Sequence, residues 1–582
     1  MRDLDQLIQS VTVSDSGKPD RKDQPAPMTT EAPDDVSDEP RATSRQWLGL
    51  AVLATGLSMI VVDGTIVNVS LPVIIDDLKL DLTDAQWVNS LYSVVFAALL
   101  LSAGRLSDRI GRRLLFIVGV AVFLAGSLLA AAADDSTSLI WARLIQGIGG
   151  AAVLPCTLST VNATFRGKDR VIAFAIWGSV IAGMAAVGPL LGGWLTTDFS
   201  WRWIFLVNVP IGILVVLGAL LVVDETKAEI AVPGLDVVGL LLSMLGFGAL
   251  IFALIEGQSI GWWKPIADLK MPGVTWSTDA PVSATPVAAL VGIVALAAFV
   301  VWERHRARAG ESAILDLSLF RFRTFSAGNV TATLVAIGEF GLLLILPLFL
   351  VNAYGLSTLG AGYVLAVMAV GAFLSGGMAR QVAGRFGAPR TVMIGLALEA
   401  FGVLVFALYL RPTSEAWVLA ILLAVYGAGL GLASAQLTGT VLVDIPTDES
   451  GQGSATESTA RQLGAALGTA ILGTVLSLFL AHSLHDRLEP IALPSQVETP
   501  IVDATRDSAG STIPAIRHEG DHGSFGAEGP AVAKALEDGF ADATRWSLFV
   551  AAGFLFLGFL SSFLLQSRRR DPDAAPVAGS SS

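Results

Sequence analysis

The sequence predicts an all-α protein that crosses a membrane about fourteen times. Of its 582 residues, 53% are hydrophobic and only 15% are charged, a balance outside the range of soluble globular proteins. Apolar runs of about twenty residues recur along the chain, and a run of this length spans a bilayer as a helix. Lys and Arg gather in alternate short connections, which is typical of the cytoplasmic loops of a multi-span protein.

Taken in order, the apolar runs form six spans, then a pair, then five, then a last single span after a long polar segment. The predicted regions are an acidic, disordered tail at 1–46, a six-helix bundle at 47–225, an inserted pair at 226–305, five helices at 306–481, an outer, disordered loop at 482–545, a last span at 546–567 and a tail at 568–582. The predicted helices are 47–71, 84–103, 113–133, 138–161, 171–195, 203–223, 235–255, 286–303, 325–350, 359–380, 390–410, 416–437, 459–481 and 546–566.

Charge distribution predicts the orientation. With the N-terminus inside, the cytoplasmic connections hold twenty Lys and Arg, including Arg461, and the short outer connections hold five. Because the bias applies to short loops, both termini are expected in the cytoplasm. The net charge of −13 is local, since residues 1–45 carry 10 acidic against 6 basic side chains and residues 482–547 carry 11 against 5.

Two connections stand apart from the short turns. Residues 304–324 form a basic, amphipathic segment that we expect to lie along the membrane surface, the alternative being an ordinary linker. The outer loop 482–545 is rich in Pro, Gly, Asp and Glu, which predicts a mobile insertion.

The sequence argues against enzyme chemistry. The single cysteine, Cys156, excludes an intrachain disulfide and a thiolate metal cluster. His518-Glu-Gly-Asp-His522 matches a zinc-protease pattern that works only on a helix, and Gly520 interrupts it. A phosphate-binding loop motif does not occur. We therefore expect no catalytic residues, no metal and no cofactor, and uphill transport would draw on an ion gradient or a separate subunit.

A polar turn joins the second and third predicted helices. Within ten residues it holds four arginines, one carboxylate and two glycines: Gly104, Arg105, Asp108, Arg109, Gly111, Arg112 and Arg113. The glycines allow close backbone approach, and the carboxylate can complement a helix N-terminus or an arginine. A weaker counterpart, Gly384-Arg-Phe-Gly387, follows the tenth helix, as expected from two repeated halves.

Three charges interrupt apolar spans. An arginine in the hydrocarbon region costs on the order of 3 kcal/mol, so Arg143 should face a cavity or a carboxylate, and Asp63 is its plausible partner. The alternative is that Arg143 snorkels to the membrane surface. Glu339 has no basic residue within a helical turn and is expected to bind protons or cationic substrates, or to make a structural contact. Phe340 and Gln146 are further candidate substrate contacts, whereas Glu256 and Glu399 rank lower, being assigned to helix ends.

The fifth predicted helix is rich in glycine. Small residues at this density make a face on which another helix packs closely, and the proline bends the helix. These residues are Gly178, Gly183, Gly188, Pro189, Gly192 and Gly193.

Several of these motifs resemble signatures of the major facilitator superfamily. Gly104-x-x-x-Asp108-Arg109-x-Gly111-Arg112-Arg113 is similar to its loop between helices two and three, and the glycine run is similar to its antiporter signature. Asp63-x-Thr-Ile-Val-Asn-Val-x-Leu-Pro72 resembles the first helix of the EmrB/QacA-type fourteen-helix drug:proton antiporters, and Arg461-Gln-Leu-Gly464 in the thirteenth helix agrees. The resemblance covers roughly residues 46–480 and the last helix.

The resemblance implies two six-helix bundles with two additional helices. It implies that the turn at 104–113 is a conformational latch and that Arg143 takes part in proton transfer, for which a buried Asp63 is a suitable partner. The expected function is proton-coupled multidrug efflux of lipophilic or cationic compounds, driven by the proton motive force and linked to antibiotic resistance. We expect a monomer in the cell inner membrane of a prokaryote, without nucleic-acid partners.

Two alternatives remain open at this point. The same fold could export an endogenous metabolite, lipid or siderophore, and one sequence does not identify the residues that line the cavity. A non-transporting membrane sensor or scaffold is disfavoured, because it would have no reason to bear the insertion cost of Asp63, Asp108 and Arg143.

Overall fold

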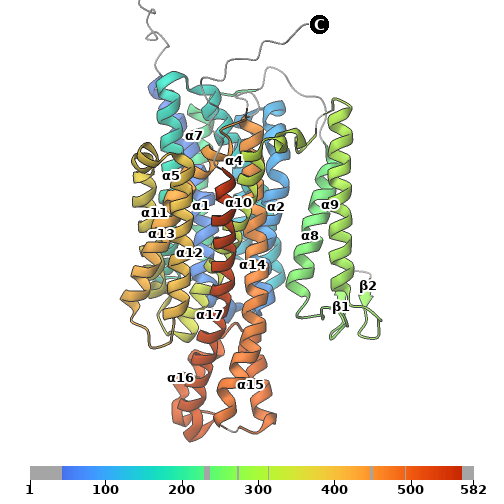
Figure 1. Cartoon of the computed structure of the whole chain (residues 1–582), viewed down its shortest axis with the longest axis vertical. Helices are drawn as coiled ribbons and strands as arrows, with labels where there is room; N and C mark the ends of the chain where they lie inside the picture. Colours follow the sequence, from blue (N-terminus) through green and yellow to red (C-terminus); the bar gives the residue numbers. More distant parts are fainter. Residues whose placement is uncertain are drawn as a thin grey trace, which may run out of the picture. The chain divides into compact units, whose positions relative to one another are not determined.

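The computed structural model describes residues 42–227, 236–271, 274–311, 313–445, 450–491 and 493–565, apart from some side chains within helices, most of them in α5. The predicted C-terminal tail and nearly all of the N-terminal tail lie outside these ranges. The described chain is a bundle of long helices with one two-stranded hairpin (Figure 1).

The first bundle follows the predicted spans closely. It consists of α1 (Ser44–Leu78), α2 (Leu82–Ile110), α3 (Arg112–Ala131), α4 (Ser136–Thr164), α5 (Gly167–Asp198) and the short α6 (Trp203–Leu206) with α7 (Asn208–Val222). Polar residues fix the starts of these helices, since Thr43 and Gln46 form a capping box at α1 and Asp135 accepts a hydrogen bond from Ser138 N at 2.7 Å at α4.

The inserted pair is α8 (Val237–Glu256) and α9 (Ala284–Arg308), which pack on each other at one side of the bundles (Figure 1). Asp236 joins them, because its Oδ1 accepts from Gly239 N at the start of α8 and from Trp302 Nε1 of α9, both at 2.8 Å. The antiparallel hairpin β1 (Leu269–Met271) and β2 (Val274–Trp276), which was not predicted, lies in their connection.

The second bundle begins with the 3-10 turn η1 (Leu317–Arg321) and α10 (Arg323–Leu348), which ends in the π-helical turn η2 (Phe349–Ala353). It continues through α11 (Thr358–Phe386), α12 (Ala388–Tyr409), α13 (Ala416–Val441), α14 (Ser450–Leu488) and α17 (Gly529–Ser562), with η6 (Phe563–Leu565) after it. The segment 304–324 differs from the expected surface helix: its first residues extend α9, and Ile314 and Leu319 are buried in the protein. These apolar side chains pack inward instead of facing lipid.

The expected disordered loop at 482–545 is corrected by the structure. Helix α14 runs on to Leu488, α17 begins at Gly529, and η3 (Glu489–Ile491), α15 (Ser495–Asp507), α16 (Thr512–Glu519), η4 (Gly520–His522) and η5 (Gly526–Glu528) connect them. Residues 489–528 are called the cap, and the end of the molecule that carries them is the cap end. The opposite end, with the turns at Gly111 and Gly387, is the turn end.

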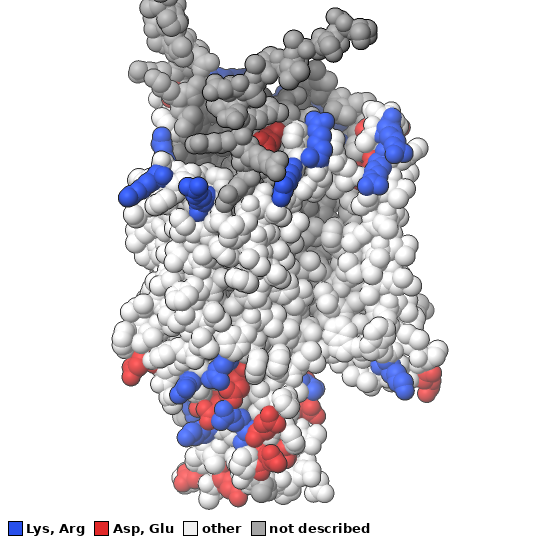
Figure 2. Space-filling model, viewed as in Figure 1, with Lys and Arg blue, Asp and Glu red and all other residues white. Residues whose placement is uncertain are grey.

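Apolar helix surfaces predict contact with lipid. In Figure 2, charged side chains lie at the two ends and a wide band between them carries none on this face. Large apolar side chains are exposed on the helices, as in Leu221 of α7 and Leu374 of α11, which are 73% and 61% exposed. Twelve helices in the described residues are long and apolar enough to cross a membrane. The other two predicted spans fall in α2 and α5, which are 29 and 32 residues long.

Candidate functional site

A buried hydrogen-bonded network surrounds Asp63 in the middle of α1. Its Oδ2 atom accepts a hydrogen bond from Arg143 Nη1 of α4 at 2.5 Å, and the two side chains are 0% and 1% exposed. Its Oδ1 atom accepts from Gln146 Nε2 of α4 at 3.0 Å and from Asn208 Nδ2 of α7 at 3.1 Å. Three donors therefore compensate the burial of one carboxylate.

The Arg143 guanidinium is enclosed on its other sides. Its Nε donates to Val88 O of α2 at 3.3 Å, its Nη1 also donates to Gln146 Oε1 at 2.7 Å, and its Cζ lies 4.2 Å from the centre of the Tyr92 ring. The ring face adds a cation–π contact. The structure thus places Arg143 against Asp63 inside the first bundle and not at the membrane surface.

Two polar residues that the sequence analysis did not single out complete this network. Ser127 Oγ of α3 accepts from Gln146 Nε2 at 2.8 Å and from Asn208 Nδ2 at 3.3 Å. Asn208 begins α7 and is the only amide side chain in the apolar run 203–222, a signal that could have identified it. Ser127 carries no such signal, because serine is common where membrane helices pack.

This geometry links a proton to helix packing. Protonation of Asp63 would remove the negative charge opposite Arg143 and turn one acceptor oxygen into a donor. A buried guanidinium that loses its counter-charge is unfavourable and must find another partner or water. The network can therefore respond to one proton by rearranging the contacts among α1, α4 and α7.

A second group of charges lies in the second bundle. Glu339 of α10 pairs with Arg461 of α14 at 3.2 Å, with side chains 5% and 38% exposed. Arg461 was counted with a cytoplasmic connection although it falls at the start of the predicted helix 459–481, and the structure places it within the helix, which is already formed at Ser450. The polar residues at 450–461 lower the hydropathy and hide this first part of α14. Phe340, next to Glu339, is partly buried.

Two further carboxyl groups accompany this pair. Glu399 lies near the middle of α12, not near an end, and is fully buried. Glu457 of α14 is 4% exposed, and its Oε2 accepts from Thr438 Oγ1 at 3.4 Å. The sequence analysis ranked Glu399 low, although a lone acid inside an apolar span is the same signal that identified Glu339. It passed over Glu457, which stands in the polar stretch 450–461 before the predicted span. Within the described residues, the hydrogen bonds and ion pairs of this group do not reach Asp63.

The glycines of α5 whose surroundings are described lie close against neighbouring helices. A Cβ atom on Gly188 would clash with the Thr65 hydroxyl of α1, and one on Gly192 would lie 2.8 Å from Ile66 O. On the other side, a Cβ on Gly193 would lie 3.1 Å from Leu359 Cα of α11. Helix α5 therefore packs closely on α1 and also on the second bundle. Gly178 and Gly183 lie outside the residues whose side-chain surroundings are described.

A second contact between the bundles runs from α2 to α14. The Ser90 and Thr469 hydroxyls are 2.5 Å apart, and a Cβ on Gly473 would lie 2.5 Å from the Gln86 carboxamide carbon. Gln86 and Ser90, like Gly193 and Leu359, lie in the parts of their helices nearer the cap end, and Thr469 lies at the middle of α14. The contacts described here thus hold the bundles together on that side.

Comparison with known families decides what kind of protein this fold belongs to. A sequence model of the Major Facilitator Superfamily matches residues 51–469. The chain belongs to the Major Facilitator Superfamily. It is therefore a multi-pass membrane transporter and not an enzyme.

Relatives in this superfamily cover most of the chain. The chain is 32% identical over 476 residues to a probable actinorhodin transporter of Streptomyces coelicolor. The aligned region covers 79% of this chain and 78% of that protein. The chain is 31% identical over 526 residues to the multidrug resistance protein Stp of Mycobacterium tuberculosis, and the alignment covers 89% of this chain and 91% of Stp. With the multidrug efflux pump LfrA of Mycolicibacterium smegmatis the identity is 34% over 443 residues, covering 75% and 82%.

A solved structure shares the fold of this superfamily member. It is a bacterial homologue of the human lysosomal transporter Spinster in an inward-facing and occupied conformation, with a TM-score of 0.59 and 18% sequence identity. The match covers 90% of this chain and 97% of that one. At this identity the likeness supports the fold alone.

The α2–α3 turn of this superfamily member is fixed by a residue from outside it. Gly111 has a φ of +123°, and a Cβ there would lie 2.6 Å from the Glu225 carboxyl group. That carboxylate accepts from Arg113 N at 3.1 Å and from Leu114 N at 3.2 Å, and so caps the N-terminus of α3. Sequence reasoning assigned a capping role to Asp108, whose side chain lies outside the described residues.

The other positions of this turn differ in their surroundings. A Cβ on Gly104 would lie 3.6 Å from Pro155 Cβ, an ordinary contact, so close approach does not require glycine there. Arg109 is exposed, and Arg112 N donates to Thr226 O at 3.0 Å. Gly387, with a φ of +86°, joins α11 to α12 as Gly111 joins α2 to α3, which matches the weak repeat in the sequence.

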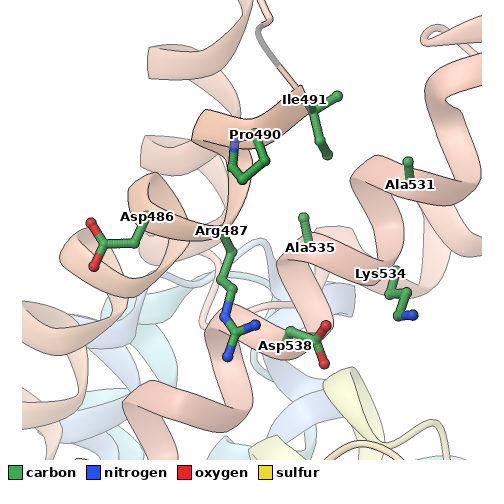
Figure 3. A pocket seen from close by; sticks show the side chains of 8 residues that line it. All are labelled: Asp486, Arg487, Pro490, Ile491, Ala531, Lys534, Ala535 and Asp538. Carbon is green, nitrogen blue, oxygen red and sulfur yellow. The ribbon is translucent and has the colours of Figure 1, made fainter.

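A cavity lies where the helices α14 and α17 join the cap, and the cap carries two histidines of the zinc-protease pattern. A hollow of about 480 Å³ lies between the end of α14 and the start of α17, lined by Arg487, Lys534, Asp538 and neighbouring residues (Figure 3). It lies beyond the apolar helix segments and apart from the two acid groups, so we do not assign transport to it. Helix α16 ends at Glu519 and Gly520 has a φ of +55°, so His518 and His522 do not share a helix face.

Proposed function

We propose that this chain is a proton-coupled antiporter that exports lipophilic or cationic compounds. The observation that carries the proposal is the buried pair of Asp63 and Arg143, held by Gln146 and Asn208 in the first bundle. A charged pair inside a membrane protein marks a functional site by default, and a protonatable carboxylate is the simplest device for coupling to a proton gradient.

The proposed cycle uses one proton at Asp63. In the described state the carboxylate is paired, and the bundles meet nearer the cap end. Protonation would release Arg143 and loosen the α1 contacts, while the close packing of α5 on both α1 and α11 lets a local change at α1 act on the other bundle. Access then alternates by rocking of one bundle against the other. We assign the latch to Gly104, Asp108, Arg109, Gly111, Arg112 and Arg113, which hold one of the two states.

The proposed topology has fourteen spans and both termini in the cytoplasm. It rests on the excess of Lys and Arg in alternate connections and on the length of α2 and α5. The cap then lies outside the cell. Because the two bundles contact each other near the cap end, we propose that the described conformation is inward-facing. We place it in a prokaryotic cell inner membrane and propose that it acts as a monomer.

The proposed substrates are drug-like cations. We propose Glu339 and Phe340 of α10 as substrate contacts, because a carboxylate that exchanges its Arg461 partner for a cationic ligand, with an aromatic residue on the same helix, suits lipophilic cations. Relatives named as multidrug proteins support this class. Gln146 is the remaining proposed contact, although both ends of its side chain are already used in the Asp63 network.

A second candidate function has the same fold but a narrower range of substrates. One relative is named a probable actinorhodin transporter and another a tetracenomycin C resistance and export protein. Export of a single endogenous metabolite, lipid or siderophore is therefore the alternative, and a panel of dyes and native lipids offered to proteoliposomes distinguishes it from broad efflux.

The test of the first proposal is Asp63→Asn, which keeps the shape and removes the protonatable group. Cells preloaded with ethidium should extrude it far more slowly with the variant than with the wild type, and an imposed pH gradient should no longer drive uptake of ethidium into proteoliposomes. Efflux at the wild-type rate would remove Asp63 from the coupling mechanism.

A further inference from the structure

The second bundle buries more acids than bases. Glu339, Glu399 and Glu457 lie on α10, α12 and α14 and are all buried, and Arg461 of α14 is the one cation that the described structure places with them. Arg461 pairs with Glu339. One guanidinium neutralises one carboxylate, so the remaining two acids cannot both be ionised in these surroundings without uncompensated charge.

Glu399 is the most enclosed of the three. It is fully buried, and within the described residues neither of its carboxyl oxygens has a hydrogen-bond partner. Helix α13 packs directly on it, since a Cβ on Gly429 would lie 3.0 Å from Glu399 Cγ. An ionised carboxylate in such a site loses its hydration and gains nothing in return. Glu399 therefore carries a proton in this conformation.

The helices around Glu399 supply few groups that can exchange charge with it. Its electrostatic neighbours are Glu339 of α10 and Arg461 of α14, and Tyr426 of α13 is close to the same carboxyls. Helix α17 also packs on α12, but its residues 546–562 contain no ionisable side chain. The proton on Glu399 is thus electrically linked to the Glu339–Arg461 pair.

Arg461 connects this enclosed acid to a more accessible space. Its side chain is 38% exposed, whereas that of Glu339 is 5% exposed. If Arg461 moves from Glu339 toward Glu399, Glu339 becomes the acid without a counter-charge and Glu399 becomes the acid with one. The favoured arrangement is then a proton on Glu339 and a carboxylate on Glu399. A movement of the Arg461 side chain would therefore favour transfer of the proton from Glu399 to Glu339.

We propose that Glu399 is a proton-binding site of the second bundle, loaded in this conformation and emptied once in each transport cycle. The proton leaves the Glu399 carboxyl group, passes through Glu339 to water beside Arg461, and is replaced when the other face of the membrane becomes accessible. The inference rests on the proposed proton-coupled export, and it adds one proton to the one assigned to Asp63.

The test is the number of protons exchanged per substrate. Full-length protein is reconstituted in proteoliposomes with a fixed ethidium gradient, and the imposed pH gradient is varied. The pH gradient at which net ethidium flux stops gives the number of protons exchanged per ethidium. Glu399→Gln should lower the ratio by one proton and leave ethidium transport coupled through Asp63. The matched control is Glu256→Gln, because Glu256 of α8 is a partly buried acid outside this bundle that accepts a hydrogen bond from Trp87. An unchanged ratio in Glu399→Gln would overturn the inference.

A second measurement needs neither ethidium nor active variants. Infrared difference spectra of the wild-type protein should show the carbonyl stretch of a protonated carboxylic acid at neutral pH, falling as the pH is raised. Glu399→Asp should shift that band and Glu399→Gln should remove it. A wild type without this band, or with a band that stays constant over all pH values at which the protein remains folded, would contradict the proposal. Loss of coupling in Asp63→Asn with an unchanged ratio in Glu399→Gln would refute this inference alone.

Discussion

The Asp63 carboxylate receives its hydrogen bonds from side chains of other helices. Arg143 and Gln146 come from α4 and Asn208 from α7, so the state of one carboxyl group depends on the placement of three helices. A hydrogen bond to a charged group contributes about 1.5 to 3 kcal/mol. Each donor therefore helps to set how readily Asp63 changes partners, and we expect removal of one to leave the fold intact and to weaken the proposed proton coupling.

Asn208→Ala removes one donor from Asp63 Oδ1. We expect ethidium efflux to fall by about tenfold or more, since a hydrogen bond of this kind is worth one or two factors of ten in rate. Initial efflux rates from preloaded cells, normalised to protein in the membrane, measure this. The control is Asn329→Ala, since Asn329 is also buried and, within the described part of the chain, its amide donates only to Phe325 O of its own helix. Equal rates for the two variants would show that Asn208 has no part in coupling.

Helix α5 packs closely on its neighbours because glycine removes the side chains that would hold them apart. At Gly193 the α11 backbone lies within reach of a single added carbon atom. The sequence located this face, because dense glycines are visible in the primary structure. It did not indicate that the face contacts both bundles, because glycine spacing on one helix carries no information about its partners.

Gly193→Val should therefore push α5 and α11 apart at the cap end. Overpacking of a tight contact costs about 1 to 3 kcal/mol, which shifts a two-state equilibrium by about 5- to 150-fold, here toward the state open at the cap end. Spin labels on α5 and α11 in a Cys156→Ser background would report longer distances. Gly553→Val is the control, because a Cβ there meets nothing within 4 Å, and a Gly193→Val distance distribution like that control would contradict the interpretation.

The cap is attached to the end of α10 by an arginine. Arg517 Nη2 donates to Asn352 O at 3.1 Å and to Ala353 O at 2.9 Å, and its Nε pairs with Glu537 at 2.5 Å. These carbonyls belong to the π-helical turn, where the regular helical bonding of the backbone ends. Composition alone predicted disorder here, since polar and glycine-rich segments hide such tertiary contacts.

Arg517→Ala should loosen the cap without unfolding the bundles. We expect a loss of about 1 to 2 kcal/mol, reduced from the buried value because the side chain is 36% exposed. Cleavage within the cap by a protease added from outside should become faster. Arg506→Ala is the matched control, because Arg506 pairs only with its neighbours Asp503 and Asp507, and equal cleavage of both variants would argue against this anchor.

At the scale of the whole molecule, hydropathy predicted the spans well and the polar interior poorly. Each of the fourteen predicted apolar runs overlaps a helix of the structure, because apolar length is what a bilayer requires. The start of α14 was predicted nine residues too late, and Arg461 was counted with a connection, because the polar start of this helix resembles a loop. Asn208, which donates to Asp63, and Glu225, which caps α3, act through contacts between distant segments. The pattern of residues within a single segment does not predict such contacts.

The complete topology is a prediction that labelling can decide. In a Cys156→Ser background, single cysteines replace residues on either side of the two helices that complete the count: Lys79 and Arg109 for α2, and Arg166 and Ser200 for α5. If both helices cross the membrane with the cap outside, a membrane-impermeant maleimide added to intact cells should label positions 79 and 200 only, and should reach 109 and 166 after the cells are opened. Labelling of both members of a pair from outside would remove that helix from the fourteen spans, and with an odd count the two termini would face opposite sides. The excess of Arg in alternate connections argues against that result, because it would place one basic set of short loops outside.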